Sequence, residues 1–262
     1  MHIVDTHCHL DAAEFGDQQA EIVIEAVACD VRTIIIPAVS YSNFSAVKAL
    51  CLRHDNCLAA YGIHPLLVGQ AEEGDWLKLR ATLEQERAVA VGEIGLDFFV
   101  DNYDRERQEY YFAEQLKLAR EFDLPVLLHV RRAQDTVLKH LRRIKVNGGI
   151  AHAFNGSRQQ ADEFIKLGFK LGFGGAMTHT RALRIRELAA TLPMESIVLE
   201  TDGPDIPPDF LPRGVPNRPA NLQRIAMTLA ELRGMSLEEV AAETTANAAS
   251  VLPMLRKRLQ AL

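Results

Sequence analysis

Several features that define other classes of protein are missing from this 262-residue sequence. No stretch approaches the roughly 18 to 20 unbroken apolar residues of a membrane-spanning helix. The first residues, MHIVDTHCHLD, carry two acids and no basic segment ahead of an apolar run, which is unlike a secretory signal peptide. We therefore expect a cytoplasmic protein that has no membrane partner.

The sequence also lacks paired cysteines and an excess of positive charge. Its four cysteines, Cys8, Cys29, Cys51 and Cys57, show no CxxC spacing, so we expect free thiols rather than a disulfide or a zinc knuckle. The 29 basic and 35 acidic residues give a net charge of −6. Proteins that coat nucleic acid non-specifically are usually basic, so a role on nucleic acid would require a local site where metal ions meet the phosphate.

No internal repeat or low-complexity tract interrupts the chain, and short apolar runs alternate with longer amphipathic segments. Eight of the runs are apolar throughout, which is typical of strands buried on both faces of a parallel sheet. The predicted strands are 2–6, 33–38, 57–64, 88–97, 124–130, 149–154, 169–174 and 196–202. The predicted helices are 18–30, 43–54, 75–87, 104–123, 133–145, 158–168, 181–192, 219–234 and 236–252.

This alternation of strand and helix favours the α/β class, specifically a (β/α)8 TIM barrel, over a doubly wound open sheet. A chain of this length is compatible with one barrel. We expect residues 1–262 to form a single domain, with the helices after residue 219 packed on the barrel.

Barrel enzymes carry their sites at the carboxyl ends of the strands. Five of the nine histidines lie at predicted strand ends: His7, His9, His64, His129 and His152. The fourth strand contains Glu93, between Gly92 and Gly95, which would allow a close approach of the backbone. The eighth strand ends in Glu200 and Asp202.

The spacing of His7 and His9 indicates a metal site, because residues two apart on a strand face the same way; Cys8 would face the other way. An HxH pair alone is a weak signal, but the joint pattern is strong. The six candidate ligands are His7, His9, Glu93, His129, His152 and Asp202.

Six nitrogen and oxygen ligands are too many for one tetrahedral zinc. They suit two divalent ions bridged by Glu93, and such a pair can activate water and bind a phosphoryl group. Mg, Mn, Zn, Co and Ni all remain open.

Seven ordered stretches resemble the signature motifs of the TatD family of metal-dependent hydrolases, in the amidohydrolase superfamily, and the nearest branch looks YjjV-like. They are DTHCHLD, GIHP, GEIGLD, LPVLLHVR, AHAFNGS, LETDGPD and PNRP. The resemblance implies a barrel, a divalent-metal site formed by the same six residues, and deoxyribonuclease activity, in some members 3′–5′ exonucleolytic. Other members are described as D-aminoacyl-tRNA deacylases.

We predict that Glu93 and Asp202 are catalytic, with Asp202 accepting a proton from water, and that His64 and Arg131 contact the phosphate of DNA or another phosphodiester. Phenylalanines are few near the strand ends, and Phe98, Phe99, Phe154 and Phe210 are candidates either for base stacking or for core packing.

Two other functions remain open. One is an amidohydrolase acting on an amide, lactone or aminoacyl ester, such as a D-aminoacyl-tRNA deacylase; a lysine at position 93 would have favoured it. The other is a barrel that binds without turnover, and the complete ligand set argues against it. Nothing in the sequence implies an obligate protein partner.

Overall fold

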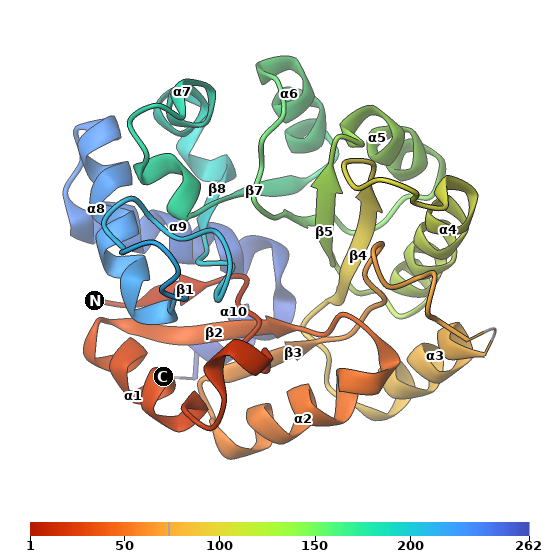
Figure 1. Ribbon diagram of the computed structural model, residues 1–262. Helices are drawn as coiled ribbons and strands as arrows, with labels where there is room; N and C mark the ends of the chain where they lie inside the picture. Colours follow the sequence, from red (N-terminus) through yellow and green to blue (C-terminus); the bar gives the residue numbers. More distant parts are fainter. Residues whose placement is uncertain (73, 262) are drawn as a thin grey trace.

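The computed structural model describes residues 1–72 and 74–261. Eight strands form a ring and the helices lie mostly outside it (Figure 1). The strands are β1 (Ile3–Asp5), β2 (Val31–Pro37), β3 (Cys57–Ala60), β4 (Val91–Asp97), β5 (Val126–Arg131), β6 (Gly149–Ala151), β7 (Phe169–Phe173) and β8 (Ile197–Leu199). All eight lie within or beside the segments predicted from the sequence.

The strands close into a barrel. Strands β1 to β3 form one parallel sheet and β4 to β8 form another. The backbone N–H of Gly92 donates to the carbonyl of Tyr61 at 2.9 Å, which joins β4 to the end of β3. The N–H of Thr6 donates to the carbonyl of Leu199 at 3.1 Å, which joins β1 to β8. Both seams are bonded, so the fold is a (β/α)8 barrel and the open doubly wound sheet is excluded.

Among the described residues, helices α1 to α9 follow the nine predicted segments and α10 was not predicted; short 3-10 turns lie between some of them. They are α1 (Gln19–Ala28), α2 (Phe44–Arg53), α3 (Asp75–Gln85), α4 (Arg105–Glu121), α5 (Gln134–Arg143), α6 (Arg158–Lys166), α7 (Leu183–Thr191), α8 (Leu222–Arg233), α9 (Leu237–Val251) and α10 (Pro253–Leu259). A capping box of Ser236 and Glu239 begins α9, and Gly234, with left-handed backbone, ends α8.

Helices α9 and α10 cover the amino ends of the strands. Ala248, Leu252 and Leu255 pack in one buried cluster with apolar side chains from six of the strands. Figure 1 shows both helices behind the ring of strands. This packing supports the proposal that residues 1–262 form one domain, and it leaves the carboxyl ends of the strands open for a site.

Within residues 1–72 and 74–261, no helix is both long and apolar enough to cross a membrane.

Candidate metal centre

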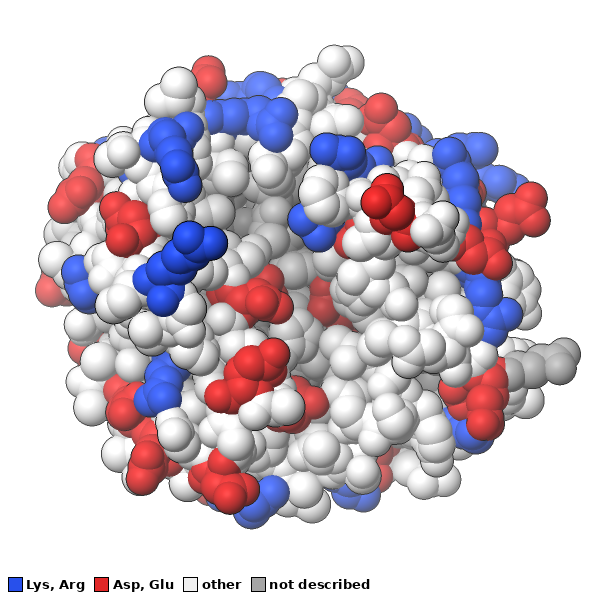
Figure 2. All heavy atoms as spheres, viewed as in Figure 1, with Lys and Arg blue, Asp and Glu red and all other residues white. Residues whose placement is uncertain are grey.

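A cavity of about 1030 Å³ opens at the carboxyl ends of the strands. Figure 2 shows it as a hollow near the centre of the visible face, with Lys and Arg side chains around its upper edge and Asp and Glu side chains below. Its lining includes five of the six predicted ligands, together with His64 and Arg131. The sixth, His7, is fully buried beneath the cavity floor and contacts Glu93.

Glu93 is the centre of the cluster, and each of its two oxygens faces a different set of imidazoles. Oε2 lies 3.2 Å from Nε2 of His7 and 3.4 Å from Nε2 of His9. Oε1 lies 3.0 Å from Nδ1 of His129 and 2.8 Å from Nε2 of His152. A carboxylate with imidazoles at both oxygens could hold divalent ions together with them.

Asp202 faces the His7 and His9 side of the cluster. Its Oδ1 lies 3.7 Å from Nε2 of His7 and 3.8 Å from Nε2 of His9. The two imidazole nitrogens are themselves only 3.3 Å apart, so the HxH pair points to one place as its spacing predicted. Cys8 turns away from both and its Sγ lies 3.6 Å from the carbonyl of Gly203.

His64 lies closer to the cluster than a phosphate contact requires. Its Nε2 is 3.5 Å from Oε1 of Glu93, the oxygen that also faces His129. Ligand atoms of His64, Glu93 and His129 fall within 4.8 Å of one another and form one of three groups able to hold an ion. His64 therefore has two candidate roles, as a phosphate contact and as a further ligand.

Asp97 is a further candidate site residue, and its contact with His129 was not predicted from the sequence. It is fully buried, and its Oδ2 lies 2.9 Å from Nε2 of His129. An ionised carboxylate only accepts hydrogen bonds, so Asp97 favours a proton on Nε2 of His129, and Nδ1, which faces Glu93, would then be the nitrogen that ligates a metal ion. Burial opposes ionisation of Asp97, but the hydrogen bonds from His129 and the Phe99 backbone lower its pKa overall.

Gly95 explains how His129 reaches this position. It pairs with His129 across β4 and β5, and a Cβ at Gly95 would lie 1.9 Å from the His129 carbonyl oxygen. Its φ of 150° also lies in a region that residues with side chains rarely adopt. The expectation that this glycine allows close backbone approach is confirmed.

The donor set fits divalent ions. Nδ1 of His7 and of His152 are buried without a hydrogen-bond partner among the described residues, and several imidazole nitrogens point at one another or at shared carboxylate oxygens. Burial opposes the charge of Glu93, yet the imidazoles of His152, His64 and His7 hold its pKa well below the usual value. An ionised carboxylate surrounded by imidazole nitrogens is the ligation that Zn, Mn and related ions accept.

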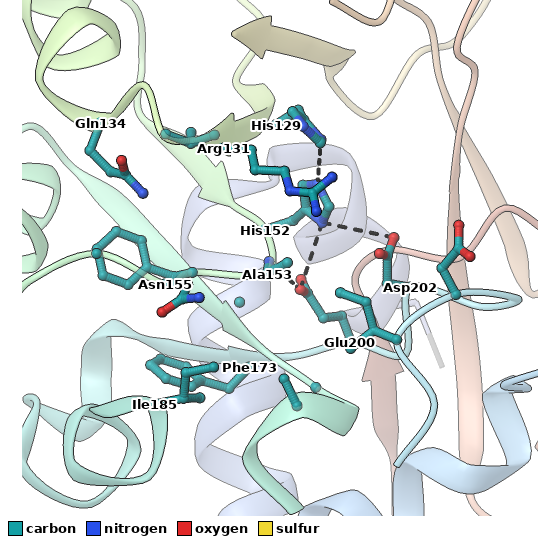
Figure 3. A pocket seen from close by; sticks show the side chains of 18 of the residues that line it. His129, Arg131, Gln134, His152, Ala153, Asn155, Phe173, Ile185, Glu200 and Asp202 are labelled. Carbon is teal, nitrogen blue, oxygen red and sulfur yellow. Dashed lines mark hydrogen bonds and ion pairs between the residues drawn. The ribbon is translucent and has the colours of Figure 1, made fainter. Parts of the chain in front are cut away.

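Glu200 is a further buried carboxylate, beside the cluster rather than within it. Its Oε1 lies 3.8 Å from Nδ1 of His152 and accepts a hydrogen bond from the Ala153 backbone (Figure 3). Burial, followed by the nearby charge of Asp202, raises its pKa to about 8. Strand β7 makes room for it, since a Cβ at Gly172 would lie 2.0 Å from Oε2 of Glu200.

After each of three strands, within one to three residues, the chain passes through a residue with left-handed backbone at the cavity. Arg132, Ala153 and Asp202 have φ values of 53°, 45° and 56° and follow β5, β6 and β8. Such a conformation costs roughly 1–2 kcal/mol for a residue with a side chain, and it clusters at functional sites. This backbone conformation turns the chain at the cavity and so changes the direction in which the side chains point.

The predicted substrate contacts occupy the rim. Arg131 ends β5 with its side chain half exposed, and Figure 3 shows it extending toward the cavity near His129. Of the four phenylalanines considered for base stacking, Phe99 is 43% exposed at the cavity, whereas Phe154 is buried against Phe164. Phe98 stacks on Tyr103 and Phe210 lies beneath Arg224.

Fold and site together define a barrel hydrolase of the divalent-metal type. The family model of the TatD-related DNases matches residues 4–253, and the chain belongs to that family. It is 43% identical over 242 residues to the metal-dependent hydrolase YjjV of Escherichia coli K12, covering 91% of this chain and 93% of that protein. The crystal structure of the E. coli YjjV protein superposes with a TM-score of 0.92 at 40% identity, over 96% of this chain and 98% of that one.

A further relative is the 3′-5′ ssDNA/RNA exonuclease TatD of Cronobacter sakazakii. It is 32% identical over 251 residues, covering 94% of this chain and 95% of that protein. These matches confirm the family resemblance, the barrel and a metal-dependent hydrolase.

Proposed function

We propose that this protein hydrolyses phosphodiester bonds of DNA from the 3′ end, using two divalent ions held by His7, His9, Glu93, His129, His152 and Asp202. The main observation in support of this proposal is that the two oxygens of Glu93 face separate sets of imidazoles. The name of the Cronobacter relative and the family's description as DNases support DNA and the 3′–5′ polarity.

Divalent ions bound at such a site supply Lewis acidity to the phosphoryl group and to the attacking water. The chain's own side chains supply the rest. Asp202 accepts the proton of the attacking water; burial raises its pKa, which makes it a stronger base than an exposed aspartate. Arg131 provides a planar fork of donors for the phosphate oxygens. His64 contacts the same phosphate.

The test compares two substrates. Chelated protein is supplied with Mg²⁺, Mn²⁺ or Zn²⁺ and mixed either with single-stranded DNA labelled at its 5′ or 3′ end or with D-aminoacyl-tRNA. We expect the 5′-labelled strand to shorten in steps while the 3′-label is released as mononucleotide. Rapid deacylation with intact DNA would refute the proposal and assign the centre to carbonyl chemistry.

Two variants accompany the test. Glu93→Ala should lose bound metal and activity while its circular dichroism stays that of a barrel. Glu187→Ala, which removes an exposed glutamate on α7 outside the cavity lining, should retain both. Full metal content and rate in Glu93→Ala would show that Glu93 does not bridge two ions.

A further inference from the structure

Two consecutive arginines and one phenylalanine form a cluster on the rim between β4 and β5. The guanidinium carbon of Arg131 lies 3.7 Å from the centre of the Phe99 ring, and that of Arg132 lies 4.5 Å from it. All three side chains line the cavity that contains the candidate metal centre. We call these three residues the arginine–phenylalanine rim.

Neighbouring residues on a strand point to opposite faces, so a regular end to β5 would separate the two arginines. The left-handed backbone of Arg132, with a φ of 53°, breaks that alternation and lets both side chains reach one ring. The backbone N–H of Phe99 donates to Oδ1 of Asp97 at 2.8 Å, which fixes the loop under the ring. The rim is thus built by specific backbone features on two loops.

The rim carries positive charge with little compensation. Within residues 1–72 and 74–261, no carboxylate lies within 4.0 Å of the Arg132 guanidinium, and Asp97 is the one that reaches Arg131, at 4.0 Å. Phe99 supports both cations through its ring face, but the two guanidinium groups repel each other. An anion bound between them would relieve that repulsion and receive bidentate hydrogen bonds.

We propose that the arginine–phenylalanine rim binds a second phosphate of the substrate, the one next to the phosphate held at the metal centre, with Arg132 as its main ligand and Arg131 shared between the two phosphates. This inference rests on the proposed function and adds to it the residues that bind the neighbouring phosphate, so polynucleotides should be preferred to small diesters that have a single phosphate. Asp97 connects the two subsites because it contacts His129 of the centre and both Arg131 and Phe99 of the rim.

The experiment measures kcat/KM for a thymidine oligonucleotide and for bis(p-nitrophenyl) phosphate, which has a single phosphate, and reports their ratio. The variants are Arg132→Ala and Phe99→Ala, both at exposed positions. The matched control is Arg143→Ala, an exposed arginine at the other end of α5 and outside the cavity lining. Charged hydrogen bonds of this kind support a loss of about tenfold in the ratio for Arg132→Ala, and no change for the control.

A binding measurement separates this inference from the proposed function. A fluorescent phosphorothioate oligonucleotide, which resists hydrolysis, is titrated onto the metal-loaded protein and followed by anisotropy. Arg132→Ala should weaken binding about tenfold relative to Arg143→Ala. If the wild type hydrolyses neither diester, the proposed function is wrong. The binding titration by itself then tests whether the rim binds phosphate. Equal losses on both substrates, or equal binding by the two arginine variants, would overturn the rim as a phosphate subsite.

Discussion

The substitution Asp97→Asn tests whether the buried carboxylate behind His129 sets the metal affinity. Both oxygens of Asp97 are acceptors in the structure: Oδ1 receives the Phe99 N–H at 2.8 Å and Oδ2 faces Nε2 of His129 at 2.9 Å. An asparagine has one acceptor oxygen and one NH2 group. Whichever way the amide turns, one of these two contacts brings a donor against a donor.

The structure sets the expected size of the effect. The barrel should remain folded, because the side chain of Gln108 holds the backbone N–H and carbonyl of Asp97 and is untouched by the change. The substitution should instead change the tautomer and the basicity of His129, and so lower its affinity for metal. Removal of the hydrogen-bond partner of a metal-ligating histidine weakens metal affinity by about 10 to 100-fold, which is roughly 1.4 to 2.7 kcal/mol.

The assay is competition for Mn²⁺ or Zn²⁺ against a chromophoric chelator, with thermal unfolding of the chelated protein as a check of folding. Asp101→Asn, an exposed aspartate in the loop that follows β4, serves as the control and should bind metal as the wild type does. An affinity of Asp97→Asn within twofold of the wild type would refute the reasoning, because the carboxylate would then be irrelevant to His129 as a ligand.

Three further outcomes are expected. His64→Ala should raise KM or lower kcat for DNA with metal content unchanged; loss of metal measured by emission spectroscopy would make His64 a ligand instead. Glu200→Gln should flatten the fall in stability of the metal-free protein between about pH 4.5 and 8. Because the folded pKa of Glu200 is raised to about 8 from 4.5, its protonated form stabilises the fold at low pH and that contribution, at most about 5 kcal/mol, is lost as pH rises; equal pH slopes in urea titrations of the two proteins would contradict this. Gly172→Ala should lower stability by about 1–3 kcal/mol through its clash with Glu200, and a double mutant with Glu200→Ala should recover most of the loss, so strict additivity would exclude the clash.

The sequence predicted the barrel well because the strands are apolar runs, and six of the eight predicted strands carry a histidine or a carboxylate at or near the carboxyl end. Strand lengths were less accurate. The run 57–64 continues to His64 in the sequence, but the strand β3 ends at Ala60 and the chain leaves the sheet before the histidine. Helix α10 was missed because Pro253 resembles a helix stop, whereas it occupies the first turn, where proline is tolerated.

The candidate ligands could be predicted because their residue types are unusual at strand ends. The supporting residues could not, since their roles depend on distances between strands. Asp97 was visible as part of GEIGLD, but nothing in the spacing showed that its carboxylate meets His129 of the next strand. Strand β7 supplies no candidate ligand to the site. It instead makes room for the side chain of Glu200, because Gly172 has no side chain.

The metal centre alone does not choose between a phosphodiester and an aminoacyl ester, because two ions and a proton acceptor serve either reaction. The choice must lie in what surrounds the centre. One part of the wall carries Arg131 and Arg132 on a shared aromatic ring, and guanidinium groups there favour a substrate with a further anionic group over a small neutral ester. A tRNA also carries phosphates beside its aminoacyl ester, so this wall separates nucleic-acid substrates from small esters. We therefore expect the loops after β4 and β5 to contribute to the choice of substrate, and substitutions there to change selectivity more than metal content.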